Sequence, residues 1–276
     1  MLTDAGPGSP IQVVFGSATD VGRRRPINED AMRAGGSLFL VADGIGGHPG
    51  GEIASATVIA AFASLAERDR VTLEELQQAF ALAVAAVAAL PQGAGAGSGT
   101  TLTGVALAEV AGDAHWLVLN VGDSRTYIMR SGVLQQISVD HSVVQELMDS
   151  GQISAKQART DPRRNIVTRS IGVGGRAEAD YWFVEAEPGD RMLVCSDGLT
   201  NELSAGHVRL VLSAGLSAQA TSDRLVSQAL LHGGRDNVTV VVIDVLSPGS
   251  ARTPAPGRVL DLGDAVQVSV VGQDAT

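Results

Sequence analysis

Acidic residues on short turns beside apolar runs constrain this chain more than any other feature. Asp43, Asp123 and Asp197 each follow a strand-like apolar run. Asp236 precedes such a run, and Glu29–Asp30 is a further acidic pair. A fold that collects strand ends at one edge would gather these carboxylates, which repel one another unless a cation lies between them. Because oxygen-only ligands favour hard divalent ions such as Mg²⁺ or Mn²⁺, metal-assisted hydrolysis is the first functional hypothesis.

The length and charge of the chain limit its domain organisation and its class of partner. Its 276 residues suit one domain, or one domain with a tail. Hydrophobic residues make up 45% and aromatic residues only 3%, so a sizeable core has to be built from Ala, Val, Leu and Ile. The net charge is −10, and the longest basic run is Arg23–Arg25. This balance argues against a nucleic-acid partner bound through a broad basic face.

Cysteine content and hydropathy predict where the protein works. One cysteine, Cys195, excludes an internal disulfide and fits a reducing compartment. The N-terminus lacks the basic and apolar regions of a signal peptide. The longest apolar helical stretches, Ile53–Ala66 and Ala79–Leu90, are shorter than the roughly 20 residues that span a bilayer. We therefore expect a cytoplasmic protein without a membrane span, and a monomer.

Two helices are predicted between Glu52 and Leu90. The first is an Ala-rich run from Glu52 to about Glu67, released from the preceding loop by Gly50–Gly51. The second opens at Thr72, and Glu75 three residues later completes a capping box. Small apolar residues occupy much of both circumferences, which indicates burial against a sheet and against each other.

Strands and further helices alternate along the rest of the chain. Short spacing predicts antiparallel neighbours, and the expected strands are Ile11–Phe15, Ser37–Ala42, Thr101–Glu109, Ala114–Val121, Arg125–Arg130, Tyr181–Glu185, Arg191–Ser196 and Val238–Val245. Helices are expected at Ser142–Ser150, Ser154–Arg159, Ala205–Leu212 and Ser217–Leu231. Strands, helices and strands again, twice over, predict an α+β fold with helix-covered sheets.

Three segments are assigned by composition. Residues 1–247 form the predicted catalytic domain, within which the polar segment 142–175 is a candidate lid. Residues 248–276 read as a Pro/Gly linker and tail. Within the tail, Val259–Gly272 is either one extra strand or disordered.

Six short motifs in a fixed order resemble the metal-dependent Ser/Thr protein phosphatases of the type 2C, or PPM, family. They are Arg-x-x-Asn-Glu-Asp at 25–30, Asp-Gly-x-Gly-Gly at 43–47, Gly-Thr-Thr at 99–101, Gly-Asp-Ser-Arg at 122–125, Ser-Asp-Gly at 196–198 and Arg-Asp-Asn at 235–237. Each motif alone is weak, because Asp-Gly is above all a turn dipeptide. The resemblance extends from about Phe15 to Val245. It implies a four-layer α-β-β-α sandwich of two antiparallel sheets flanked by helices, with a small lid.

The resemblance also implies a metal site. An Asp side chain has two oxygens, and a Gly allows its carbonyl to approach an ion closely. By resemblance, Asp43 bridges two metals and Gly44 offers its carbonyl. Asp197 and Asp236 complete the first metal. Asp123 resembles the residue that holds a third metal with Asp197 in bacterial members, although a structural role in capping its own hairpin turn remains open.

The remaining predicted site residues act through water or on the substrate. Glu29 and Asp30 are expected to hold metal-bound waters, with a plain surface acid as the alternative for Glu29. Arg25 is the expected catalytic clamp on the substrate phosphate, because a guanidinium fork matches two phosphate oxygens. The predicted cofactors are two to three Mn²⁺ or Mg²⁺ ions. Ile45 replaces the His of many eukaryotic members, so the general acid has to be a metal-bound water or another group.

The predicted reaction is hydrolysis of phosphoserine and phosphothreonine in proteins by a metal-bridging hydroxide. The expected partners are Ser/Thr-phosphorylated proteins, including a cognate bacterial Ser/Thr kinase that the enzyme opposes. Two alternatives remain: a catalytically weak module that binds phosphoproteins, and a phosphatase of small phosphoesters on the same fold. A thiol mechanism is disfavoured, because Cys195 lies in an apolar run and Asn201 stands where a tyrosine-phosphatase loop needs Arg.

Overall fold

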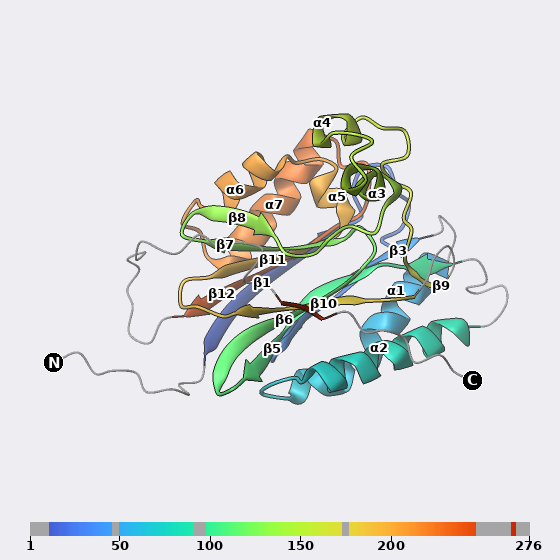
Figure 1. Cartoon of the computed structure of the whole chain (residues 1–276). Helices are drawn as coiled ribbons and strands as arrows, with labels where there is room; N and C mark the ends of the chain where they lie inside the picture. The colour runs from blue at the N-terminus through green and yellow to red at the C-terminus, as the bar shows by residue number, and fades with distance from the viewer. Residues whose placement is uncertain (1–10, 46–49, 91–97, 173–176, 247–265, 269–276) are drawn as a thin grey trace.

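Two antiparallel sheets pack face to face, and helices cover both outer faces (Figure 1). The structure is a computed structural model that describes residues 11–45, 50–90, 98–172, 177–246 and 266–268. The arrangement confirms the predicted four-layer α-β-β-α sandwich. Among the described residues, no helix is long and apolar enough to cross a membrane.

The first sheet has five strands in the order β1-β12-β11-β7-β8. Their bounds are β1 Gln12–Asp20, β12 Val238–Leu246, β11 Arg191–Cys195, β7 Arg125–Arg130 and β8 Val133–Gln136. The first and last long strands of the chain, β1 and β12, pair along their whole length. This closure brings the start of the chain beside its last long strand.

The second sheet follows the order β13-β10-β6-β5-β3-β4-β9, and β2 pairs with β3 beside this path. Its strands are β13 Val266–Val268, β10 Asp180–Glu185, β6 Asp113–Val121, β5 Leu102–Val110, β3 Leu38–Ile45, β4 Gly99–Thr100, β9 Ile171–Gly172 and β2 Asp30–Gly35. The β13 backbone pairs with Tyr181–Phe183 of β10, so part of the predicted extra strand exists. The rest of the tail lies outside the described residues.

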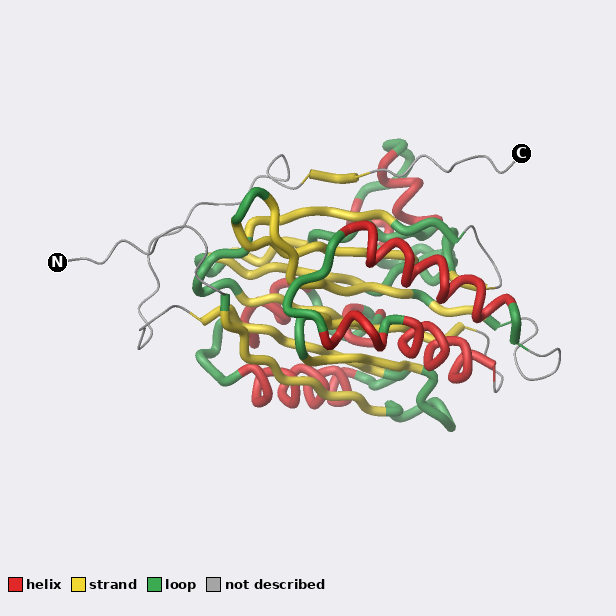
Figure 2. The backbone as a smooth tube through the Cα atoms, turned by 90° about the horizontal axis from the view of Figure 1, so that it is seen from below, coloured by secondary structure: helices red, strands yellow, loops and turns green. Residues whose placement is uncertain are grey.

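The helices divide between the two outer faces. Helix α1 (Gly50–Ala61), the 3₁₀ helix η1 (Ala63–Glu67) and α2 (Leu73–Ala88) cover the second sheet, as the view from below shows (Figure 2). The first sheet is covered by α5 (Asp197–Thr200), α6 (Ala205–Leu212) and α7 (Ala218–His232). The candidate lid contains α3 (Val143–Asp149) and α4 (Ala155–Ala158).

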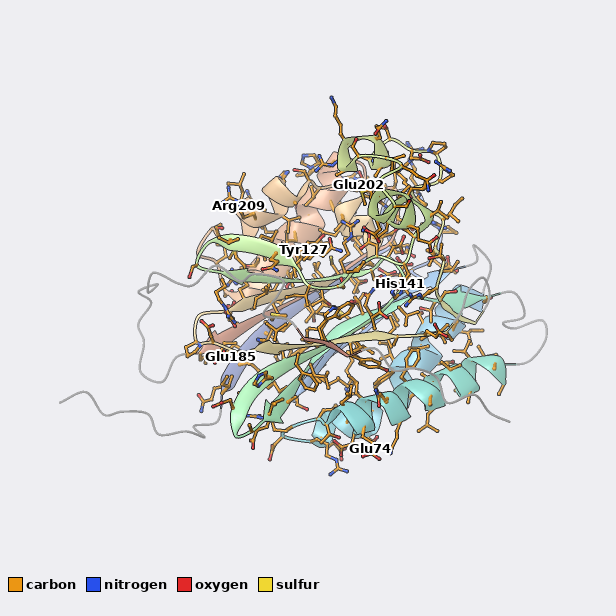
Figure 3. The ribbon with its side chains drawn as sticks, viewed as in Figure 1. Glu74, Tyr127, His141, Glu185, Glu202 and Arg209 are labelled. Carbon is orange, nitrogen blue, oxygen red and sulfur yellow. The ribbon has the colours of Figure 1, made fainter. Side chains whose placement is uncertain are left out.

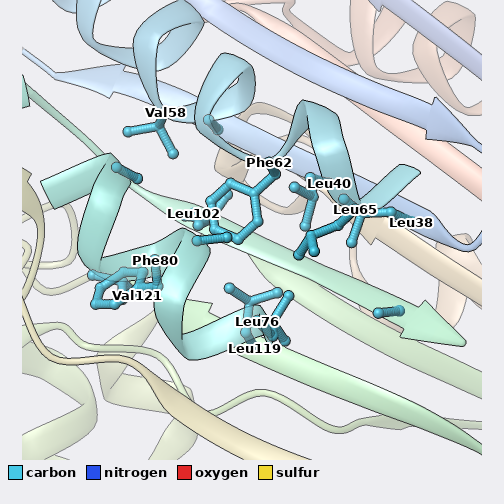
Figure 4. Close-up of a cluster of buried hydrophobic side chains, with 14 of the residues drawn as sticks. Leu38, Leu40, Val58, Phe62, Leu65, Leu76, Phe80, Leu102, Leu119 and Val121 are labelled. Atoms are coloured by element: carbon cyan, nitrogen blue, oxygen red, sulfur yellow. The ribbon is translucent and has the colours of Figure 1, made fainter. Parts of the chain in front are cut away.

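Strand β3 shows why the sheets are buried on both sides. Its alternating residues Leu38 and Leu40 face the helices, whereas Phe39 and Val41 face the other sheet. Figure 4 shows Leu38 and Leu40 beside Phe62 in the cluster under α1 and α2. A strand buried on both faces has a continuous run of apolar residues. Such runs in the sequence predict that the carboxylates beside them lie at strand ends.

Several predicted boundaries were wrong, because tertiary pairing overrides local preference. Strand β1 continues past Phe15 to Asp20, although it contains Gly16. That glycine is needed, because a Cβ there would lie 2.2 Å from the Gln219 backbone of α7. The first helix changes to 3₁₀ geometry after Ala61 instead of continuing to Glu67. The capping box of Thr72 and Glu75 is confirmed, with α2 ending at Ala88.

Five short elements were missed from the sequence. They are β2, β4, β8, β9 and α5. All residues of β2 are half-buried, so the strand has no alternation of buried and exposed positions. Only its pairing with β3 identifies it as a strand. Helix α5 is a single turn that begins at Asp197, two residues after β11 ends at Cys195.

Candidate metal centre

The predicted acidic residues come from four separate parts of the chain and meet at one end of the two sheets. Asp30 opens β2 and lies directly opposite Asp43 of β3 in the strand register. Asp197 begins α5, two residues after β11 ends at Cys195. Asp236 lies just before β12, and Asp123 lies in the turn between β6 and β7.

Electrostatics confirm that these carboxyl groups are close neighbours. Burial raises the pKa of Asp43 well above its ordinary value, and the charges of Asp30 and Asp197 raise it further. Asp123 and Asp236 act in the same direction on Asp43. Burial is also the main cause that raises the pKa of Asp30 to about 7 and that of Asp197 to about 6. Such an arrangement is unfavourable until a cation compensates it.

Strand β3 carries Asp43 through backbone contacts with the Gly-Thr-Thr motif. The Asp43 N–H donates to Thr101 Oγ1 at 3.1 Å, and its carbonyl accepts from the Thr101 N–H at 2.9 Å. Thr100 Oγ1 also donates to that carbonyl, at 2.9 Å. Neither threonine was predicted as a site residue, although their motif pointed to this region. Their contacts hold the backbone at the end of β3. These hydrogen bonds do not use the Asp43 carboxylate.

Glu29 is a buried residue and not the surface acid of the alternative reading. Its side chain is 5% exposed, and Gly51 packs directly on it, because a Cβ there would lie 2.6 Å from Glu29 Oε1. The Glu29 carbonyl accepts from Ser55 Oγ at 2.6 Å and from the Gly44 N–H at 3.2 Å. A Cβ on Gly44 would lie 2.6 Å from the same carbonyl. Glycine is therefore required where helix α1 passes the acidic edge.

Arg25 lies at the rim of the acidic cluster. Its side chain is 40% exposed, its Nη2 is 2.8 Å from Asp236 Oδ2, and its Nη1 is 3.9 Å from Glu29 Oε2. The guanidinium therefore faces the centre and remains accessible to a ligand in solvent.

Asn237 fixes the backbone on which Arg25 and Glu29 lie. Its Oδ1 accepts from the Glu29 N–H at 2.8 Å, and its Nδ2 donates to the carbonyls of Val21 and Ile27, both at 2.9 Å. This buried amide thus holds both ends of the loop that carries Arg25. The Arg-Asp-Asn motif signals the residue, but no sequence pattern signals partners about 210 positions away.

Asp123 faces the cluster, whereas its neighbours have structural partners. Burial and the charge of Asp197 raise the pKa of Asp123 well above its ordinary value. Ser124 Oγ lies 2.8 Å from Thr101 Oγ1, and Arg125 forms a forked pair with Asp140 at 2.6 to 3.0 Å. These contacts give Ser124 and Arg125 structural roles.

Burial makes Cys195 chemically inert. Its thiol is fully buried, and burial raises its pKa to about 12. A thiolate nucleophile is therefore excluded at neutral pH.

The donor set fits hard divalent cations. All its side chains are oxygen ligands, and Asp30 Oδ1 is buried without a hydrogen-bond partner among the described residues. Within the described ranges, no three acidic, histidine or cysteine side chains already form a chelating group. Arg25 pairs with Asp236, and Asp197 shares a hydrogen bond with Asp43.

A two-sheet sandwich with an acidic, oxygen-only centre at one end defines the class of metal-dependent phosphatases. The family described as Protein phosphatase 2C matches residues 23–230, and the chain belongs to this family.

Known proteins of this family are similar over most of the chain. The Mycobacterium tuberculosis serine/threonine protein phosphatase PstP is 39% identical over 236 residues, which cover 84% of this chain and 45% of PstP. The chain therefore spans about half the length of that relative. The Listeria monocytogenes serine/threonine phosphatase stp is 33% identical over 239 residues, which cover 82% of this chain and 93% of stp.

Solved structures share the fold. The crystal structure of M. tuberculosis PstP/Ppp has a TM-score of 0.79 at 37% identity, covering 86% of this chain and 100% of that one. The PstP catalytic domain in complex with two manganese ions has a TM-score of 0.77 at 36% identity, covering 86% of this chain and 99% of that one.

Proposed function

We propose that this chain hydrolyses phosphoserine and phosphothreonine in proteins with the help of two to three Mn²⁺ or Mg²⁺ ions. The observation that carries the proposal is the meeting of Asp30, Asp43, Asp123, Asp197 and Asp236 at one edge, where burial and neighbouring carboxylate charges raise the pKa of Asp30, Asp43, Asp123 and Asp197. Buried carboxylates that destabilise one another persist where function requires them. Family membership and the named relatives support the same activity.

Each acidic residue has a proposed role. Asp43 would bridge two ions, with the Gly44 carbonyl beside it. Asp197 and Asp236 would complete the first position, and Asp123 would share a third with Asp197. Glu29 and Asp30 would hold the ions through water. When bound, the ions supply water activation near neutral pH and compensate charge on the phosphoryl group.

Arg25 would bind the substrate phosphate. Its guanidinium is partly exposed and already lies against a carboxylate oxygen of Asp236, which a phosphate oxygen resembles in charge and geometry. It would orient the phosphorus over the acidic cluster and offset negative charge as the ester bond breaks. Because Ile45 cannot donate a proton, the residue that protonates the leaving serine or threonine oxygen is not assigned.

Two variants test these roles. Asp197→Asn should abolish Mn²⁺-dependent phosphate release from a phosphothreonine peptide, while Asp69→Asn, which changes an exposed acid, should retain it. Arg25→Lys should raise KM by about tenfold or more, because a lysine cannot form the forked contact. Undiminished turnover by Asp197→Asn would contradict the proposal.

The alternatives predict different results in the same assays. A module that only binds phosphoproteins would bind Mn²⁺ and phosphopeptide in calorimetry without turnover. A small-phosphoester phosphatase would prefer nucleotides or p-nitrophenyl phosphate over the peptide. We further propose a cytoplasmic monomer that opposes a cognate Ser/Thr kinase. Size-exclusion chromatography and dephosphorylation of candidate phosphorylated kinases test these last points.

A further inference from the structure

His141 lies where the acidic centre meets the lid. The residue is 5% exposed and follows β8 in the segment that leads into α3 (Figure 3). Its N–H donates to the Gly122 carbonyl at 2.9 Å, and its own carbonyl accepts from the Thr168 N–H at 2.8 Å. The backbone of His141 therefore links the turn that carries Asp123 to the lid segment around Thr168.

The imidazole repeats this connection with its two nitrogens. Nδ1 accepts the Gly122 N–H at 3.1 Å, and Nε2 lies 3.1 Å from Asp180 Oδ2. A backbone N–H can only donate, so Nδ1 is the acceptor and the proton resides on Nε2. Asp180 is the acceptor for that proton, because burial, which raises its pKa, is outweighed by the hydrogen bonds from His141 and Arg169, so that the pKa of Asp180 is lowered and it is a carboxylate. Each nitrogen thus serves one partner.

The contact with Asp180 reaches the lid directly. Arg169, at the end of the lid, pairs with the other oxygen, Asp180 Oδ1, at 3.1 Å. Just below the lid helices, Ser142 and Val167 form an antiparallel bridge. Asp180, the first residue of β10, therefore contacts both chain segments at the base of the lid: His141, where the chain enters the lid, and Arg169, where it returns.

The contact with Gly122 bears on Asp123. Gly122 has φ +104°, and a Cβ there would lie 2.5 Å from Thr101 Cγ2, so the turn is tightly packed on one side. On the other side it has the His141 ring and Asn120 Nδ2, which donates to the Gly122 carbonyl at 3.1 Å. Loss of the Nδ1 contact would leave a buried N–H unsatisfied beside Asp123.

We propose that His141 is a positioning residue with two separable contacts: Nδ1 fixes the Asp123 turn, and Nε2 fixes the base of the lid. The part that concerns Asp123 as a metal ligand rests on the proposed function. The part that concerns the lid does not.

Two substitutions separate the contacts. Asn places its amide oxygen the same number of bonds from Cβ as Nδ1, and Gln places its amide nitrogen at the reach of Nε2. His141→Asn should therefore retain the Gly122 contact and lose Asp180. Exchange of lid amides near Thr168 should become at least tenfold faster and KM should rise, while Mn²⁺ affinity is retained.

His141→Gln should show the opposite pattern. Lid exchange should stay within about twofold of the parent, while calorimetry should show the weakest Mn²⁺ site at least tenfold weaker or lost, and kcat should fall more than KM rises. The matched control is His115→Asn, a half-buried histidine of β6 whose Nδ1 lies 3.0 Å from the Asp113 carbonyl and whose ring packs edge-on against Phe183, with no hydrogen bond to the lid or to the Asp123 turn among the described residues. It should change none of these values.

The lid measurement is made in chelator, so it stands even if the parent binds no Mn²⁺ and the proposed function fails. If the His141 variants do not fold, Asp180→Ala removes the acceptor of the same contact from β10 and should reproduce the faster lid exchange of His141→Asn. Equal effects of the Asn and Gln variants on both readouts, or no effect of either, would overturn the proposal.

Discussion

Asp30 should make the stability of the metal-free protein depend on pH. Burial raises its pKa from 3.8 to about 7, although hydrogen bonds from Thr239 and Ser196 oppose the rise. Below about pH 4 the carboxyl is protonated in both the folded and unfolded states. Between pH 4 and 7 only the unfolded state releases the proton, so rising pH favours unfolding. Above the folded-state pKa the loss is complete and stays constant.

The size of the effect follows from the shift. At about 1.4 kcal/mol per pKa unit, a rise from 3.8 to about 7 corresponds to about 4 kcal/mol. Between pH 5 and pH 7 the share is about 2 kcal/mol, because half of the folded-state carboxyl is already ionised at pH 7. For a domain of this size, that equals roughly 4–8 °C in Tm. Asp30→Asn removes the titrating carboxyl group and conserves its volume. The difference in Tm between the variant and the parent should therefore grow by this amount from pH 5 to pH 7, in favour of the variant.

The assay is thermal unfolding of the parent and of Asp30→Asn in chelator at pH 5, 6, 7 and 8. Asp69→Asn is the control, because that side chain is exposed. Excess Mn²⁺ should reverse the advantage of Asp30→Asn at pH 7, since a cation stabilises the carboxylate. A difference in Tm that stays constant within 1 °C from pH 5 to 8 would refute the reasoning.

Three further predictions concern residues around the centre. Asn237→Ala should lower the free energy of unfolding by about 2–4 kcal/mol in urea titration, because it removes three buried hydrogen bonds. Gly198→Ala should cost about 3 kcal/mol or more and reduce phosphatase activity, since its Cβ would lie 1.9 Å from the Asn237 carbonyl oxygen. Gly206→Ala, on the exposed side of α6, should instead stabilise by about 0.5–1 kcal/mol. Iodoacetamide at pH 8 should leave Cys195 unmodified in the folded protein and label it after denaturation, as mass spectrometry can measure.

Each of these predictions can fail clearly. An unfolding free energy of Asn237→Ala within 0.5 kcal/mol of the parent would contradict its role as a clamp. Equal stability of the Gly198 and Gly206 variants would show that the close approach is relieved by small shifts. Rapid labelling of folded Cys195 would contradict its burial.

Local sequence signals were sufficient for most elements. The capping box of Thr72 and Glu75 begins α2 as expected, and Arg125–Arg130 is a strand with the predicted bounds. These features depend on neighbours within a few residues, so the sequence states them directly. Strand β2 and helix α5 could not be predicted, because only the pairing with β3 identifies β2 and because α5 is a single turn.

The sequence by itself predicted which residues bind metal: acidic side chains on short turns, in an order that resembles the family to which the chain belongs. Tertiary structure decided how they face one another. The register of β2 on β3 sets Asp30 opposite Asp43, and the side chain of Asn237 holds the Arg25 loop from more than 200 residues away. Such pairings depend on strand order and on burial of polar groups, which are properties of the whole fold and leave no local pattern in the chain.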